Sequence, residues 1–332
     1  MRITAADQLG WQLRQQHLDP ILTAPRRHPA GPCRLRNRRR LGSPWRSRGV
    51  DVETAARSGG AGMSTAIAWI EGQWGTATNL QLPLDDRALL LADGLFETVL
   101  IRNGAPQLLQ EHLQRWSDSA TLLGMDPPPQ RNALEPLIED AIQRSQLSEA
   151  DGALRLNWSR GSSPQRGIGL PAPGHHRFWL TLQACTPTFS AVSTITSRHE
   201  RRNASSRLSR CKTFAYGQSI QARREAQEQG VDDALLLNTA GALCCGTAAN
   251  LLVRRRGQWL TPPLSSGCLP GVMRGRALAQ GIAVETKLAA TFDADDQAVL
   301  INSLSCRPIA SHNGKPMAAT TTAVDLWQSL LH

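Results

Sequence analysis

Apolar and polar positions alternate regularly along the chain from about residue 66 onward. Segment 66–72 has the pattern of a short strand. Two further strand-like runs, 95–102 and 106–109, flank Asn103-Gly104, the dipeptide most typical of a tight hairpin turn. These patterns predict a strand followed by a β-hairpin.

Two amphipathic helices are predicted next. The first covers 110–124 and ends at Gly124, because glycine readily adopts the left-handed conformation that follows many helices. The second covers 131–147, whose apolar residues fall on one stripe with helical spacing: Leu134, Leu137, Ile138, Ile142 and Leu147.

The remaining pattern mixes strands and helices. Strands are predicted over 152–159 and 176–185, and a long helix over 214–229 ends at Gly230. Further strands are expected at 233–237, 242–245, 250–254, 258–261, 297–302 and 307–310, with helices at 272–281 and 320–331. Helices interleaved with turn-punctuated strands predict a mixed α/β (α+β) fold of two domains, 63–187 and 188–332, connected over 187–191.

Residues 1–62 differ from this body in charge. They carry twelve arginines and no lysine against Asp7, Asp19, Asp51 and Glu53, so most of the net charge of +10 lies there. The segment LRNRRRLGSPWRSRG lacks apolar periodicity and is typical of disorder. It is interpreted as an extension ahead of a start at Met63; a nucleic-acid arm and a targeting segment are the alternatives.

Several classes of protein are not expected. No apolar run approaches the roughly 20 residues that a membrane helix needs. The seven cysteines form no CxxC pair and no Cys/His ligand spacing, so neither a metal site nor a disulfide framework is predicted. An odd cysteine count without a signal-peptide core favours the cytoplasm, and we expect neither a membrane nor a nucleic-acid partner.

Lysine is rare in this chain, and one lysine has an informative position. Lys212, Lys287 and Lys315 are the only lysines among 37 cationic side chains. Lys212 follows a basic stretch and precedes a long amphipathic run. Lysine, unlike arginine, can lose its proton and form an imine. Lys212 is therefore either a solvated cation or a Schiff-base lysine.

The ordered motifs of the body resemble one enzyme family. The motifs are LADGLFETVLIRNG (91–104), HLQRW (112–116), RLNWSRG…RG (155–167), CKTFAYGQSIQARREAQEQGVDDALLLN (211–238), GTAANLLV (246–253), TPPL…GCLPGVMR (261–274) and INSLSCRP (301–308). Together they resemble the fold-type IV pyridoxal-phosphate enzymes, which include branched-chain and D-amino-acid aminotransferases and 4-amino-4-deoxychorismate lyases. The resemblance implies a two-domain, D-amino-acid-aminotransferase-like architecture with pyridoxal 5′-phosphate between the domains.

The resemblance also assigns roles to residues. Lys212 stands where the family places the lysine that binds the cofactor covalently and moves protons at the substrate. Arg115 matches the arginine that binds the cofactor phosphate. Val272 and Met273, after Gly271, match a second phosphate contact at a helix start. Ser303 matches a hydroxyl or backbone contact to the same phosphate.

One position departs from the family pattern. Most relatives have a glutamate, five residues before the motif asparagine, that pairs with the pyridine nitrogen of the cofactor. Counting back from Asn250 gives Cys245. A thiol holds a proton on that nitrogen poorly unless it ionises, and ionisation is costly in an apolar pocket. The departure predicts either lost catalysis or a reaction that needs less stabilisation of a carbanion.

The expected reaction is the conversion of 4-amino-4-deoxychorismate to 4-aminobenzoate and pyruvate, a step toward folate. This elimination is driven by aromatisation of the ring, and lyase members often carry a run like Asn302-Ser303-Leu304. Arg160 and Arg166 are candidates for binding the substrate carboxylates, with surface cations as the alternative. The rival functions are a branched-chain or D-amino-acid aminotransferase and a catalytically weakened cofactor-binding relative. The resemblance further implies a homodimer.

Overall fold

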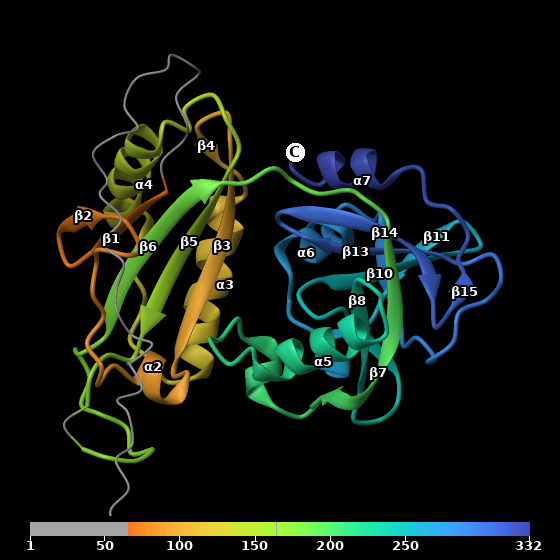
Figure 1. Ribbon diagram of the computed structural model, residues 1–332, viewed down its shortest axis with the longest axis horizontal. Coiled ribbons are helices and arrows are strands. Elements are labelled where there is room, and N and C mark those ends of the chain that lie inside the picture. Colours follow the sequence, from red (N-terminus) through yellow and green to blue (C-terminus); the bar gives the residue numbers. More distant parts are fainter. Residues whose placement is uncertain (1–65, 164) are drawn as a thin grey trace, which may run out of the picture. The chain divides into compact units, whose positions relative to one another are not determined.

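The computed structural model describes residues 66–163 and 165–332 (Figure 1). The expectations for residues 1–62 lie outside the described residues. Within the described part the chain forms two β-sheets with helices against them, as the mixed α/β pattern predicts. The first sheet has six strands and the second has nine.

The first sheet is antiparallel throughout, in the order β2-β1-β6-β5-β3-β4. Its strands are β1 (Ile67–Ile70), β2 (Gln73–Gly75), β3 (Gly94–Arg102), β4 (Ala105–Pro106), β5 (Gly152–Ser159) and β6 (Arg177–Ala184). The predicted turn at Asn103-Gly104 joins β3 to β4, and both residues have positive φ, as a tight hairpin turn requires.

Three helices belong to the same part of the chain: α2 (Arg87–Leu91), α3 (Leu109–Leu122) and α4 (Arg131–Ser145). Helix α3 packs against β3, and α4 against β1 and β6. Their apolar stripes bury Trp116, Leu134 and Ile138 in one core with the strands. Successive side chains of a strand point to opposite faces, so Leu95, Val99 and Ile101 of β3 enter this core while Phe96 and Thr98 face the other way.

The second sheet runs in the order β12-β11-β10-β13-β14-β7-β8-β9, with β15 on β14. Its strands are β7 (Val192–Arg202), β8 (Asp233–Asn238), β9 (Leu243–Cys245), β10 (Asn250–Arg255), β11 (Gln258–Thr261), β12 (Ala283–Glu285), β13 (Gln297–Asn302), β14 (Ser305–His312) and β15 (Lys315–Pro316). A further pairing of Cys245 with Asn250 joins β9 back to β10 and closes six strands into a ring. Parallel pairs of β7 with β8 and with β14 lie within the ring.

The helices of the second part are α5 (Gly217–Glu228), α6 (Val272–Ala279) and α7 (Ala323–Ser329), with short 3₁₀ turns η1 (Arg207–Arg210) and η2 (Leu264–Ser266). Helix α5 packs on β7 and β8, α6 on β12 and β13, and α7 on β14. Buried Trp327 of α7 anchors the chain end, because its indole N–H donates to the carbonyl of Asn302.

The sequence pattern missed one long strand. No strand was expected between 191 and Lys212, yet β7 occupies most of that interval. Its apolar residues are only Val192 and Ile195, and its other positions are Ser, Thr, His, Glu and Arg. Hydropathy therefore gives a weak signal, although β-branched threonine suits a strand. The chain passes between the two sheets over 185–191; the division into domains at 187/188 stays a prediction.

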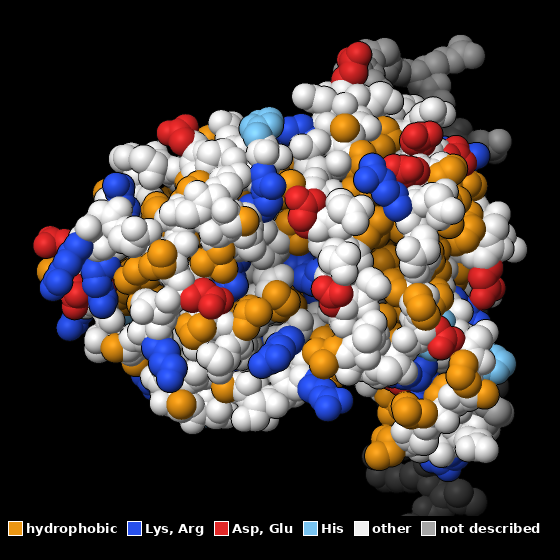
Figure 2. Space-filling view, turned by 180° about the vertical axis from the view of Figure 1, so that it is seen from behind, with side chains coloured by type: hydrophobic (Ala, Val, Ile, Leu, Met, Phe, Trp, Pro, Cys, Tyr) orange, Lys and Arg blue, Asp and Glu red, His pale blue; other side chains and the backbone are white. Residues whose placement is uncertain are grey.

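The surface of the described part carries mixed charge. Figure 2 shows basic and acidic side chains interspersed on the face that it presents. No helix in the ranges 66–163 and 165–332 is long and apolar enough to cross a membrane. The same ranges contain no group of His, Cys, Asp and Glu side chains that could hold a metal ion.

Candidate active site

A cavity of about 540 Å³ is lined by residues of both sheets and by the segment that leads into α5. Four cationic side chains line it: Arg115, Arg155, Arg202 and Lys212. Its described lining contains no Asp or Glu. The cavity is therefore strongly electropositive and suited to ligands with several negative charges.

Lys212 lies half-buried in the cavity wall, in an extended segment held by β3. The amide of Phe96 donates to the carbonyl of Lys212 at 2.9 Å, and Thr213 forms a β-bridge with Leu95. The ammonium nitrogen lies 4.1 Å from the centre of the Phe96 ring. It donates to the hydroxyl of Tyr216, the only tyrosine of the chain, at 3.1 Å. The amine is thus positioned beside a phenol and faces the cavity.

Arg115 reaches the cavity from α3 and is held from behind by a buried carboxylate. Its Nε and Nη2 donate to Glu97 at 2.8 and 2.5 Å, and its Nη1 donates to the carbonyl of Pro270. Burial raises the pKa of Glu97, but the positive charge of Arg115 and hydrogen bonds from His112 and Arg115 outweigh it and bring the pKa to about 2. The ionised pair orients the guanidinium and leaves one N–H on each terminal nitrogen for a ligand.

The first turn of α6 lies on the same cavity. Gly271 precedes the helix, and no side chain caps the amides that follow it, including those of Val272 and Met273. Free amides and the helix dipole make such a turn an anion site. Asn250 holds the segment just before the turn, because its side-chain amide donates to the carbonyl of Leu269 at 2.9 Å. A Cβ at position 271 would overlap Asn250 Oδ1, so this close approach requires glycine.

Ser303 completes this group of donors from the loop between β13 and β14. Its hydroxyl lies in the cavity wall, 3.1 Å from Nε2 of His112. His112 in turn lies 2.8 Å from Glu97 through Nδ1. A carboxylate, an imidazole and a hydroxyl therefore form a chain from the core to the cavity.

The residues present fit a phosphate-bearing cofactor with an aldehyde. Arg115, Ser303 and the free amides of α6 supply donors that suit a phosphate. Among the described residues, Lys212 supplies the only primary amine in the wall. The structure thus brings together the residues that the sequence assigned to the cofactor: Lys212, Arg115, Cys245, Val272, Met273 and Ser303.

Cys245 lies at the end of β9, opposite Asn250, and lines the cavity. It is 8 % exposed and belongs to a buried cluster with Cys244 and Cys268. The thiols of Cys245 and Cys268, together with burial, raise the pKa of the Cys244 thiol. The turn after Cys245 is fixed to β8, because the hydroxyl of Thr247 donates to the carboxylate of Asp233 at 2.7 Å. No described carboxylate lines the cavity, so none replaces the glutamate that the family pattern places at position 245.

The sequence motifs do not single out Arg155, yet it lies in the cavity wall. It projects from β5, paired with Thr98, and its guanidinium carbon lies 3.5 Å from the centre of the Phe96 ring. Its Nε donates to Asn157, and neither terminal nitrogen has an acceptor among the described residues. Burial lowers the pKa of Arg155. The alternation of Leu154 and Leu156 with Arg155 and Asn157 was the available signal, because it puts Arg155 on the face opposite the core.

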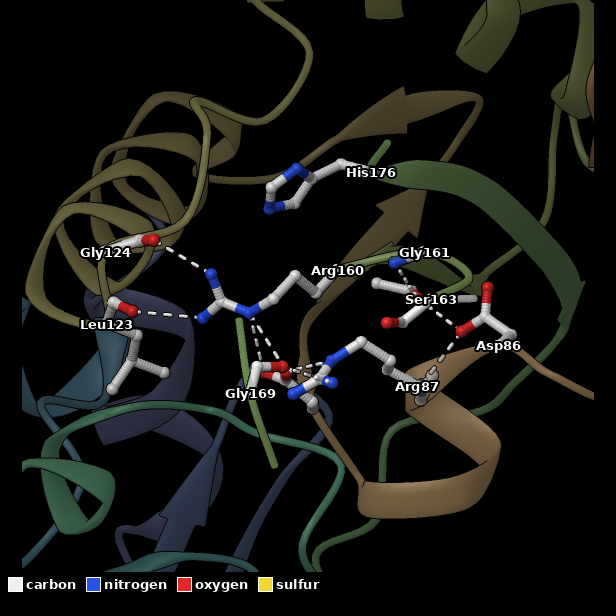
Figure 3. A network of polar contacts seen from close by, with 12 residues as sticks. Asp86, Arg87, Leu123, Gly124, Arg160, Gly161, Ser163, Gly169 and His176 are labelled. Carbon is white, nitrogen blue, oxygen red and sulfur yellow. Dashed lines mark hydrogen bonds and ion pairs between the residues drawn. The ribbon is translucent and has the colours of Figure 1, made fainter. Parts of the chain in front are cut away.

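Arg160 and Arg166 do not line the cavity. Figure 3 shows Arg160 bound elsewhere, with its terminal nitrogens donating to the carbonyls of Gly124 and Leu123. Its Nε donates to Asp93. This guanidinium is 7 % exposed and ties the end of α3 to the loop before β3. Arg166 is exposed. The structure therefore does not bring either arginine to the candidate site, and Arg160 has a supporting role within the fold.

Comparison with known proteins gives consistent results. The family model for amino-transferase class IV matches residues 94–312. A bifunctional aminodeoxychorismate lyase / D-amino acid transaminase of Mycobacterium tuberculosis is 30 % identical over 245 residues, covering 67 % of this chain and 78 % of the relative. A putative branched-chain-amino-acid aminotransferase of Methanocaldococcus jannaschii is 26 % identical, covering 62 % and 71 %.

Among solved structures, a putative 4-amino-4-deoxychorismate lyase of Legionella pneumophila is 25 % identical, with a TM-score of 0.68 over 77 % of this chain and 96 % of that one. These matches confirm the predicted fold, and pyridoxal phosphate is the cofactor of the family, as the motifs indicate. From residue 94 to residue 312, the sequence, the fold and the donors around Lys212 agree, and the chain belongs to the class IV aminotransferases, the fold-type IV pyridoxal-phosphate enzymes.

Proposed function

We propose that this enzyme is a pyridoxal-phosphate-dependent lyase that converts 4-amino-4-deoxychorismate to 4-aminobenzoate and pyruvate. The observation that carries the proposal is Arg155, whose terminal nitrogens have no acceptor among the described residues and which lines a cavity whose described lining holds no carboxylate. The substrate carries two carboxylates, and a guanidinium fork binds a carboxylate with two parallel hydrogen bonds. A branched-chain side chain carries no charge for this guanidinium to bind.

The chain's own groups have distinct roles in this proposal. Arg115, Ser303 and the α6 amides hold the cofactor phosphate, and Arg155 orients a substrate carboxylate. The bound cofactor supplies electron withdrawal from the substrate carbon that carries the amino group. Lys212 takes the proton from that carbon through its Nζ. The C–O bond to the enolpyruvyl group then breaks with its electron pair going to the oxygen, the ring becomes aromatic, and the departing enolate takes up a proton at carbon to become pyruvate.

Cys245 supports an elimination over a transamination. Transamination relies on a long-lived negative charge delocalised into the cofactor ring, which a carboxylate beside the pyridine nitrogen stabilises. Aromatisation of the product supplies part of the driving force for the lyase reaction, so the need for that stabilisation is smaller. Cysteine in place of glutamate at position 245 therefore suits the lyase better.

An aminotransferase acting on D-amino or branched-chain amino acids is the second candidate. It is favoured by the M. tuberculosis relative, whose name combines lyase and D-amino acid transaminase activities, and by the M. jannaschii relative, which is named a putative branched-chain-amino-acid aminotransferase. A catalytically weakened cofactor-binding relative is the candidate from another class, and Cys245 is the residue that favours it. As part of the proposal, the enzyme acts in the cytoplasm, in folate biosynthesis, as a homodimer.

The proposed reaction is tested by giving the cofactor-loaded protein 4-amino-4-deoxychorismate without any keto acid. We expect 4-aminobenzoate and pyruvate to appear in equal amounts, measured by chromatography and by a coupled pyruvate assay. A transaminase needs a keto acid to complete its cycle, so a strict keto-acid requirement would contradict the lyase proposal. Cofactor binding without either activity would favour the weakened relative.

Replacing Cys245 by glutamate should raise any transaminase activity of the protein. The new carboxylate would keep the pyridine nitrogen protonated, and the ring would then stabilise negative charge better. The measurement is the rate of keto-acid-dependent amino transfer from D-alanine and from leucine in wild type and Cys245→Glu, with Cys245→Ser as the neutral control. An unchanged rate in a folded, cofactor-bound Cys245→Glu variant would remove the argument from position 245.

A further inference from the structure

The chain Glu97–His112–Ser303 is the most unusual polar feature of the site, because two of its members lie inside an apolar core. Glu97 and His112 are each 1 % exposed, and neither lines the cavity. His112 lies 2.8 Å from Glu97 through Nδ1 and 3.1 Å from Ser303 through Nε2. Only Ser303 lies in the cavity wall, at the proposed phosphate position. The chain therefore links that position to a buried acid and base.

The proton positions follow from the charges. Arg115 and His112 keep Glu97 ionised, with a pKa of about 2, so Glu97 accepts hydrogen bonds. Burial lowers the pKa of His112, and the hydrogen bond and negative charge of Glu97 oppose this only in part. A neutral His112 donates from Nδ1 to Glu97 and accepts at Nε2. Ser303 must then donate its hydroxyl proton to His112 and has none left for a ligand.

A phosphate dianion beside Ser303 conflicts with this arrangement, because it accepts hydrogen bonds and cannot donate them. If Ser303 turned its proton to the phosphate while His112 stayed neutral, Nε2 would lose its hydrogen-bond donor in a buried position, which is unfavourable. Both bonds can form only when Nε2 carries a proton of its own. Nε2 then donates to the serine oxygen while the serine hydroxyl donates to the phosphate.

We propose that Glu97, His112 and Ser303 form a proton relay in which binding of the cofactor phosphate is accompanied by uptake of one proton at His112. This inference rests on the cofactor site proposed above. One proton moves from solvent to Nε2, the serine hydroxyl changes its acceptor, and no covalent bond changes. His112 is thereby a positioning residue that acts through Ser303.

The charges around His112 support the direction of this change. The groups that act on its charge are Glu97, Arg115 and Lys212. Glu97 favours the imidazolium ion, whereas Arg115 and Lys212 oppose it. A phosphate held by Ser303 would add close to two negative charges near His112. Binding of the phosphate therefore favours protonation of the His112 ring. By linkage, protonation of His112 in turn favours binding of the phosphate.

The relay is tested by isothermal titration calorimetry of the protein freed of cofactor, with 4-deoxypyridoxine 5′-phosphate, which keeps the phosphate but cannot react with an amine. Titrations in two buffers of different ionisation enthalpy, at about pH 7.5 where the phosphate is mostly a dianion, give the number of protons taken up. We expect wild type to take up about one proton more than His112→Asn. Any proton that the ligand ring itself gains or loses on binding contributes equally to both proteins and cancels when the two uptakes are subtracted.

Two further variants separate the relay from a general effect of charge. Ser303→Ala should lose most of the extra uptake, because the hydroxyl no longer needs the imidazolium donor. His312→Asn is the matched control: His312 is also buried and bonded to threonine hydroxyls, of Thr194 and Thr196, but lies outside the cavity lining. It should retain the full uptake. Equal uptake in wild type and His112→Asn, or full uptake in Ser303→Ala, would overturn the relay.

Wild-type protein alone gives a second measurement that does not depend on folding of the variants. In ¹⁵N-histidine NMR spectra at the same pH, one buried ring should change from the neutral to the doubly protonated pattern when the ligand binds. Binding without such a change contradicts the relay and leaves the cofactor site standing. No binding in the calorimeter overturns the cofactor site together with the relay.

Discussion

Lys212→Ala should lower the rate of product formation by at least ~10²- to 10⁴-fold, the usual contribution of a positioned acid–base group. The variant would lack both the covalent attachment of the cofactor and the base that takes the substrate proton. Phosphate contacts through Arg115 and Ser303 remain, so the variant should still bind the cofactor reversibly. The measurement is kcat for 4-aminobenzoate release under saturating cofactor.

Lys287→Ala is the matched control for this change, because Lys287 is exposed and lies outside the cavity lining. Its kcat should equal that of wild type. The variant Lys212→Arg tests the role of the amine separately from its charge, since arginine keeps the positive charge but cannot form the covalent link or act as a base. A Lys212→Arg protein with substantial activity would contradict the assignment of this residue.

Arg155→Gln should raise KM for 4-amino-4-deoxychorismate by roughly 10- to 150-fold. This range corresponds to the loss of about 1.5–3 kcal/mol from a hydrogen bond to a charged group. The effect should be much smaller for D-alanine, which has no second carboxylate. The side chain has no partner carboxylate among the described residues, so the variant leaves no buried acid unpaired and should fold.

Arg224→Gln provides the comparison for Arg155. Arg224 lies exposed on α5, paired with Glu228, and its replacement should leave KM unchanged. Thermal melting of both variants verifies that they fold. If Arg155→Gln binds the dicarboxylate substrate as well as wild type does, Arg155 does not select it, and the observation that carries the lyase proposal is lost.

Much of the fold could be predicted, because its signals are local. Asn103-Gly104 marks the β3–β4 hairpin, and apolar stripes mark α3 and α4 within one or two residues at each end. Strand β7 could not be found in this way. It lies inside the second sheet but carries few apolar residues, and its strand state depends on pairing with β8 and β14.

In the candidate site, too, local motifs identify some residues, whereas others depend on contacts between distant parts of the chain. Residues in ordered motifs, such as Lys212, Arg115 and Ser303, were identified and share one cavity. Arg155 and Arg160 lie five residues apart and have similar chemistry, yet the first faces the cavity and the second is bound by Asp93 and two carbonyls. The choice between them depends on strand register and on partners distant in sequence. The Glu97–His112 pair needs the packing of α3 on β3, which no local pattern contains.

We expect the cavity around Lys212 to hold pyridoxal phosphate through a covalent bond to this lysine. Reduction of the holoenzyme with sodium borohydride, followed by proteolysis and mass spectrometry, tests it most directly. With three lysines in the chain, the result is unambiguous. We predict that the reduced cofactor is recovered on the peptide that contains Lys212. Recovery on Lys287 or Lys315, or on no lysine of a protein loaded with the cofactor, would contradict the account.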